Sequence, residues 1–245
     1  MPRINEGWRA GGLLLHPTSL PSFYGIGDLG PQAHNLARFM KKAGLHYWQM
    51  LPLTHTSPGL GNSPYSAFSA FAGNPLLISP EFMARDGWLT KDEIAAAEMP
   101  ASHVVDFERV TFKKLALIES AFERAEERLK NHAGFNEFAW NNGPWMNDYA
   151  FFIAVKKYFG GRRWLDWPED LKRRDETALR RYGADLARPI MREKFAQYLF
   201  HSQLLELRQA LAYEGLGLIG DAAIYVNHDS SDVWAQQHLF HLDSA

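Results

Sequence analysis

The stretch Gly217-Leu218-Ile219-Gly220-Asp221-Ala222-Ala223-Ile224-Tyr225-Val226 is a short apolar run that ends in a carboxylate. Its apolar residues are too few for a helix and its glycines disfavour one, so the run predicts a buried parallel strand. A predicted helix and a glycine turn precede it. In barrels and doubly wound sheets, binding and catalytic side chains gather where parallel strands end. Asp221 is therefore the first candidate for a functional residue.

Two earlier apolar runs, residues 11–16 and 47–53, predict two more buried strands. Between them, Gly30-Pro31 opens a predicted helix and Gly44 ends it. A strand, a helix and a second strand imply a parallel, right-handed crossover. The fold class is therefore α/β. Because three parallel strands do not close a barrel and leave the third strand with an unpaired edge, the sequence predicts the front part of a larger domain.

The chain is expected to divide into three parts. Residues 1–78 hold the first two strands and a long loop that starts at Thr54. Residues 79–183 are helical and too long for an ordinary connection between strands, so we interpret them as a helical subdomain inserted between strands two and three. Residues 184–245 hold a long helix, the third strand and the start of the next loop.

Helix starts follow from capping residues and prolines in the second and third parts. They are expected at Ser79-Pro80, at the capping box of Thr90 and Glu93, near Asp106, at Pro144 and near Pro189.

The composition of the 245 residues limits the classes of function. The net charge is −2, which gives no support for a nucleic-acid partner or an anionic membrane surface. The absence of cysteine excludes disulfides and thiolate metal sites, and neither a signal peptide nor a membrane-spanning run is visible. We expect a cytoplasmic protein. Aromatic residues make up 13%, which suits ligands with flat apolar faces such as sugars or bases, although burial in the core explains most tryptophans.

Two motifs are weaker than they look. Residues 25–30 match G-x-G-x-x-G, but a strand directly before the motif and an acid about 20 residues later are both missing, so we reject dinucleotide binding. Its glycines are expected to serve a turn, and Asp28 to cap backbone N–H groups. His238 and His241 have helical spacing without a supporting zinc motif. We expect no metal site and no cofactor.

The long loop after the second strand carries Ser63-Pro64-Tyr65-Ser66. A tyrosine there can stack on a sugar ring while its hydroxyl donates to a sugar oxygen. The alternative is an aromatic side chain packed inward as a loop anchor. Asp221 has a similar alternative as a cap of a turn, although its place at a strand end favours a ligand contact.

Six segments together resemble one family, the 4-α-glucanotransferases (amylomaltases or disproportionating enzymes). The matching segments are residues 9–21, 25–30, 48–53, 63–76, 220–226 and 228–234. They occur in the family's order and span the whole chain, but only the N-terminal half of the family's enzyme. The resemblance implies a (β/α)₈ TIM barrel and transfer of α-1,4-glucan segments between maltodextrins, with retention through a covalent glycosyl-enzyme.

By motif match, the resemblance implies that Ser63, Tyr65 and Asp221 contact the sugar substrate. The family's nucleophile follows strand four and its acid/base follows strand five, so no catalytic residue is expected within residues 1–245, and the chain alone is expected to be inactive. Its expected partners are a maltooligosaccharide and the missing C-terminal part of the enzyme. The alternative function is a maltodextrin-binding module without catalysis. Ala222-Ala223 departs from the family's usual aliphatic residue and proline, which frees the turn after Asp221.

Overall fold

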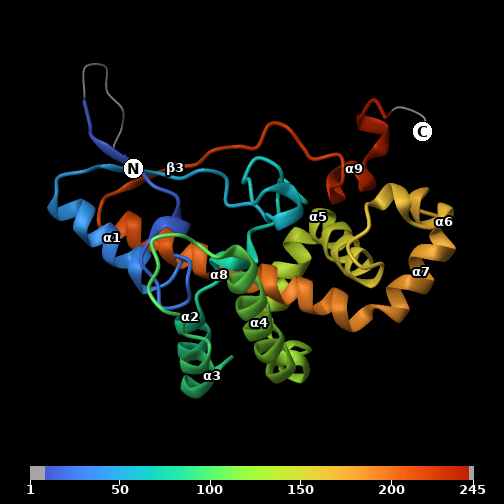
Figure 1. Cartoon of the computed structure of the whole chain (residues 1–245), viewed down its shortest axis with the longest axis horizontal. Helices are drawn as coiled ribbons and strands as arrows, with labels where there is room; N and C mark the ends of the chain where they lie inside the picture. The colour runs from blue at the N-terminus through green and yellow to red at the C-terminus, as the bar shows by residue number, and fades with distance from the viewer. Residues whose placement is uncertain (1–8, 243–245) are drawn as a thin grey trace. The chain divides into compact units, whose positions relative to one another are not determined.

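The computed structural model describes residues 9–242, and Figure 1 shows the order of their helices and strands along the chain. Within these residues, no helix combines the length and the apolar character that crossing a bilayer requires.

Three short strands form one parallel sheet in the described part of the chain. They are β1 (Gly12–Leu14), β2 (Tyr47–Gln49) and β3 (Gly217–Ile219), in the order β1-β2-β3. Leu13 pairs with Trp48, which in turn pairs with Leu218. The predicted parallel α/β arrangement is confirmed, with strands shorter than the apolar runs that predicted them.

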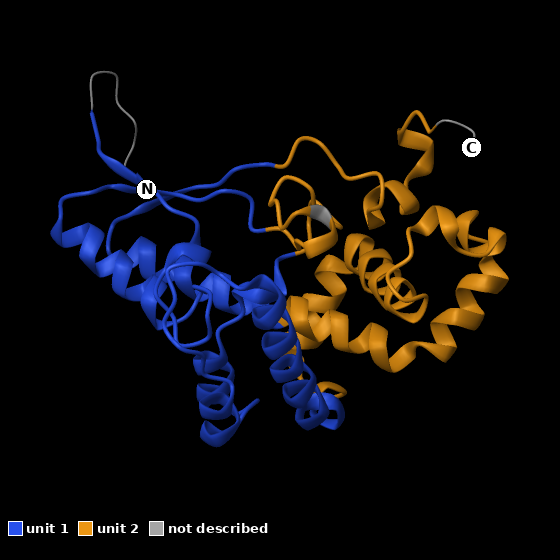
Figure 2. Cartoon of the chain, viewed as in Figure 1, with its two compact units in different colours: residues 1–53, 73–128, 199–222 blue, residues 54–72, 129–198, 223–245 orange. Residues whose placement is uncertain are grey.

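The chain forms two compact units that alternate along the sequence (Figure 2). Unit 1 comprises residues 1–53, 73–128 and 199–222, and unit 2 comprises residues 54–72, 129–198 and 223–245. The three-part division expected from the sequence, a partial barrel with a helical subdomain inserted between strands two and three, stays a prediction.

Unit 1 contains the sheet and the helices α1 (Pro31–Lys42), α2 (Pro80–Arg85) and α3 (Lys91–Ala96), followed by α4 (Phe107–Leu129). Its short 3₁₀ helices are η1 (Pro17–Ser19) and η3 (Pro75–Leu77). The predicted helix starts are confirmed at Pro31, at Ser79-Pro80 and at Thr90, where both hydrogen bonds of the capping box form. Trp48 is fully buried at the centre of the sheet, and its indole N–H donates to the Leu15 carbonyl (2.8 Å).

Unit 2 is helical and has an aromatic core. It contains α5 (Ala133–Tyr158), α6 (Glu169–Lys172), α7 (Glu176–Asp185) and α9 (Ser231–Ala235), with the 3₁₀ helices η2 (Pro58–Leu60), η4 (Trp164–Asp166) and η5 (Gln237–Leu239). The long α8 (Ala187–Tyr213) has residues in both units. The buried Trp234 ring stacks on Phe151 with ring centroids 5.6 Å apart. Core packing therefore accounts for much of the aromatic content, as expected.

The prediction that a helix opens at Pro144 is wrong. Helix α5 begins eleven residues earlier, where the His132 ring accepts a hydrogen bond from the Phe135 N–H (3.1 Å), and Pro144 lies inside it. Phe135 and Phe138 are buried, so core packing stabilises the earlier turns. A proline inside a helix removes one hydrogen bond, here to the carbonyl of Trp140. Trp140 is 85% exposed, and water can satisfy a carbonyl at such a surface.

Candidate functional site

Asp221 lies in unit 1, two residues beyond the end of β3, and its side chain is exposed. It lies at one end of the lining of a cavity of about 660 Å³, which runs along β3 from Gly215 to Asp221 and is also lined by residues of α8. The rest of the lining is mostly aliphatic and includes Met50, Leu51, Leu53, Leu204 and Leu218. Asp221 therefore follows a parallel strand, as predicted. Its contact with a ligand stays a prediction.

Ser63 and Tyr65 belong to unit 2, in a tight turn of the long loop. The Ser66 N–H donates to the Ser63 carbonyl (3.1 Å), and the Tyr65 N–H donates to the Ser63 hydroxyl (3.3 Å). The Thr54 hydroxyl closes the turn from the other side by donating to the Pro64 carbonyl (2.6 Å). Tyr65 is 45% exposed on this turn. Whether its ring contacts a sugar or anchors the loop stays a prediction.

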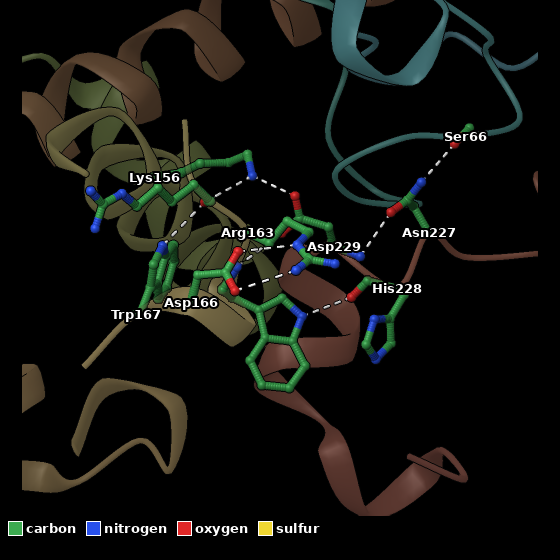
Figure 3. Close-up of polar contacts among 10 residues, drawn as sticks. Ser66, Lys156, Arg163, Asp166, Trp167, Asn227, His228 and Asp229 are labelled. Carbon is green, nitrogen blue, oxygen red and sulfur yellow. Dashed lines mark hydrogen bonds and ion pairs between the residues drawn. The ribbon is translucent and has the colours of Figure 1, made fainter. Parts of the chain in front are cut away.

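The segment that follows Asp221 along the chain is held in unit 2 by a partly buried ion pair (Figure 3). The carboxylate of Asp229 accepts from the Lys156 ammonium (2.5 Å) and from the Trp164 N–H (3.1 Å). The Trp164 indole N–H also donates to the His228 carbonyl (2.7 Å). Our reading of the sequence missed these contacts. The only signal was the run of Asn, Asp and Ser between 227 and 232.

Asp28 is a structural residue. Its carboxylate accepts from the buried Lys114 ammonium (2.7 Å) and from the Gly30 N–H (3.0 Å), so the predicted backbone cap is confirmed. Lys114 also donates to the Ile78 carbonyl (2.8 Å). Burial lowers the pKa of the Lys114 ammonium, and the Asp28 carboxylate opposes that effect. Both oxygens of Asp28 are thus engaged inside the protein.

Near the start of the long loop, the ring of His55 lies next to a tyrosine of α5. The His55 Nδ1 lies 2.7 Å from the Tyr149 hydroxyl, which also accepts from the Gln197 amide (3.3 Å). Burial lowers the pKa of His55 to about 4, and burial raises the pKa of Tyr149 well above its usual value. His55 is therefore neutral in the folded chain at pH 7.

This shift predicts a pH-dependent stability. Below pH 6.5 the unfolded chain protonates His55 while the folded chain does not, so the unfolded state gains protons and stability falls between pH 6.5 and 4. We expect wild type to lose about 2 to 3 kcal/mol more than His55→Gln between pH 7 and 4.5. Urea unfolding at both pH values measures the difference. Equal losses of unfolding free energy in wild type and His55→Gln would contradict the lowered pKa of His55.

No group of three or more potential metal-ligating side chains gathers within residues 9–242. The expectation that the protein needs no metal and no cofactor stays a prediction.

Comparison with known proteins gives consistent results. A family model described as 4-alpha-glucanotransferase matches residues 15–245. The 4-alpha-glucanotransferase of Thermus thermophilus is 41% identical over 96% of this chain, and that of Aquifex aeolicus is 37% identical over 96%. A relative from Solanum tuberosum, "4-alpha-glucanotransferase, chloroplastic/amyloplastic", is 38% identical over 96%. The chain spans about half the length of the curated relatives it matches, 46% in the Thermus case.

Solved structures are similar as well. The amylomaltase from Streptococcus agalactiae in complex with acarbose superimposes with a TM-score of 0.88 at 35% identity, over 96% of this chain and 48% of that one. The amylomaltase from Corynebacterium glutamicum shares the fold with a TM-score of 0.73 at 21% identity, over 94% of this chain and 32% of that one. The three parallel strands therefore correspond to part of an amylomaltase barrel. Since the family model covers nearly all of its residues, this chain belongs to the 4-α-glucanotransferase family.

Proposed function

We propose that this chain forms part of the glucan-binding surface of an enzyme that transfers α-1,4-glucan segments between maltodextrins. The observation that carries the proposal is the joint occurrence of the family match with an exposed Tyr65 on its turn and an exposed Asp221 beyond β3. The acarbose complex of the Streptococcus agalactiae relative supports a glucan-like ligand.

Each residue has a distinct role in this proposal. The Tyr65 ring stacks on the apolar face of a sugar, and its hydroxyl bonds a sugar oxygen. The Ser63 hydroxyl, which accepts from the Tyr65 N–H, is a second polar contact. The Asp221 carboxylate accepts hydrogen bonds from sugar hydroxyls, and such charge-assisted bonds are stronger than neutral ones.

The reacting carboxylates are assigned outside this segment. Retention requires two carboxyl groups about 5–5.5 Å apart, one as nucleophile and one as acid/base. The family resemblance puts these after strands four and five of the barrel, whereas Asp221 follows strand three. We therefore propose that residues 1–245 contribute substrate contacts and that transfer requires the remaining strands.

Glucose release from maltotriose tests whether residues 1–245 bind substrate but lack the reacting carboxylates. We expect none from the 245-residue chain, and release from a chimera in which the C-terminal half of the Thermus thermophilus relative follows Ala245. The proposal would be contradicted if the 245-residue chain alone released glucose and Asp221→Asn abolished that activity. Binding of maltoheptaose without turnover in either protein would favour the alternative, a maltodextrin-binding module.

Tyr65→Ala is expected to weaken binding of maltoheptaose about 10- to 100-fold, because the variant loses both the stacking surface and the hydroxyl. Tyr65→Phe keeps the ring and should lose only a few-fold. Isothermal titration calorimetry measures both. The control is Tyr213→Ala, because this side chain at the end of α8 is 90% exposed. Equal affinities for Tyr65→Ala and this control would rule out the stacking role.

A further inference from the structure

A set of polar contacts in unit 2 links the loop that carries Tyr65 to the segment 227–232. The roles described so far leave these contacts unexplained. They join residues more than 160 positions apart in sequence, and they involve both side chains and backbone groups.

The first contact is adjacent to Tyr65. The Asn227 amide N–H donates to the hydroxyl of Ser66, the residue directly after Tyr65 (2.7 Å; Figure 3). The same Asn227 side chain accepts from the Asp229 N–H through its oxygen (2.7 Å). Because both ends of the amide are bonded, its orientation is defined, and it holds Ser66 at a set place relative to residue 229.

The second contact lies a few residues further along the loop. One carboxylate oxygen of Asp232 accepts from the Ser69 hydroxyl (2.9 Å), and the other accepts from the Ala70 N–H (2.7 Å). Next to it, the Phe68 carbonyl accepts from both the N–H (2.8 Å) and the hydroxyl (3.0 Å) of Ser231. Ser69 and Ser231 are almost completely buried, so the bond from the Ser231 hydroxyl to the Phe68 carbonyl is shielded from water, whereas the bond from the Ala70 N–H is exposed.

The segment that supplies these bonds is itself anchored. Asp229, between Asn227 and Asp232, is held by the Lys156 ammonium of α5 and by the Trp164 N–H. The segment that bonds the loop is therefore itself held in place by contacts to Lys156 and Trp164.

We propose that Asn227 and Asp232 are positioning residues of the glucan site, which hold the turn of Ser63 and Tyr65 in its binding conformation. This inference rests on the proposed function, because it assumes that Tyr65 contacts the sugar. A loop ordered before binding loses less conformational entropy when the ligand arrives, so its affinity is higher. Neither residue needs to contact the sugar for this effect.

The test combines two measurements on the 245-residue chain. Hydrogen exchange monitors the peptide that spans residues 63–72, and calorimetry measures the Kd for maltoheptaose. We expect Asn227→Ala and Asp232→Ala to speed exchange in this peptide about 10-fold and to raise the Kd about 5-fold. Asn141→Ala and Asp185→Ala, two exposed positions in unit 2 outside the network, serve as matched controls and should change neither quantity.

A double-mutant cycle separates positioning from general destabilisation. If Asn227 acts through Tyr65, Asn227→Ala should change the Kd less than about 2-fold in a Tyr65→Ala background. An equal loss in both backgrounds would overturn the inference, as would unchanged exchange in the two variants or faster exchange with unchanged affinity. If the wild-type chain binds no maltoheptaose, the proposed function fails and the role at a glucan site fails with it. The exchange measurement then still decides whether the two residues order the loop.

Discussion

Lys114→Met is expected to lower the free energy of unfolding by about 3 to 5 kcal/mol, because it leaves the Asp28 carboxylate buried without its partner. The Lys114 and Asp28 side chains are 1% and 6% exposed, and their charged atoms lie 2.7 Å apart. The lost ammonium also bonds the Ile78 carbonyl, which stays unsatisfied in the variant. Urea unfolding monitored by tryptophan fluorescence measures the effect.

The neighbouring lysine provides a control for this variant. The Lys113 ammonium bonds the backbone carbonyls of residues 96–98 near the surface, so Lys113→Met should cost less than about 1 kcal/mol. Adding Asp28→Asn to Lys114→Met removes the unpaired charge, and much of the lost stability should return. If the two lysine variants have equal free energies of unfolding, the buried pair of Lys114 and Asp28 does not stabilise the fold as proposed.

Gly27→Ala is expected to destabilise the chain by about 3 kcal/mol or more, because a Cβ atom has no room there. It would lie 2.1 Å from the Pro17 carbonyl oxygen and 2.7 Å from the backbone nitrogen of Leu20. These are backbone atoms of the turn around η1, so no side-chain rotation relieves the clash. The Gly27 N–H also donates to the Thr18 carbonyl (3.1 Å), which keeps the two segments in contact.

Gly59→Ala is the matched control for this clash. The nearest atom to its added Cβ is the Ser57 hydroxyl oxygen at 3.9 Å, an ordinary contact distance. We expect a change within about 0.5 kcal/mol in the thermal or urea unfolding free energy. A Gly27→Ala variant as stable as Gly59→Ala would show that the turn moves to accept a side chain.

The glycine-rich segment also shows what sequence reasoning can and cannot provide. The missing strand and missing acid were enough to reject dinucleotide binding at residues 25–30 and to expect a turn. Gly25 has a φ of +75°, which favours glycine, whereas Gly27 is required by the close approach of η1. Chain order alone does not reveal which segment approaches Gly27.

In the rest of the molecule too, features set by nearby residues were predicted, and features set by distant contacts were not. Hydrophobic periodicity and capping residues predicted the sheet and most helices, because these depend on neighbours within a few residues. The start of α5 was wrong, because burial of Phe135 and Phe138 outweighed the local signal of Pro144. The links from Asn227 and Asp232 to the loop were not predicted, since they depend on which distant segments meet in the folded chain.

That distance in sequence affects the order of events during synthesis. Ser69 precedes its partner Asp232 by 163 residues. At about 5–20 residues per second, the ribosome makes the two positions roughly 8 to 30 s apart. Until then, the nascent loop around Tyr65 lacks the carboxylate that later bonds it, so this loop reaches its final order late in translation of residues 1–245.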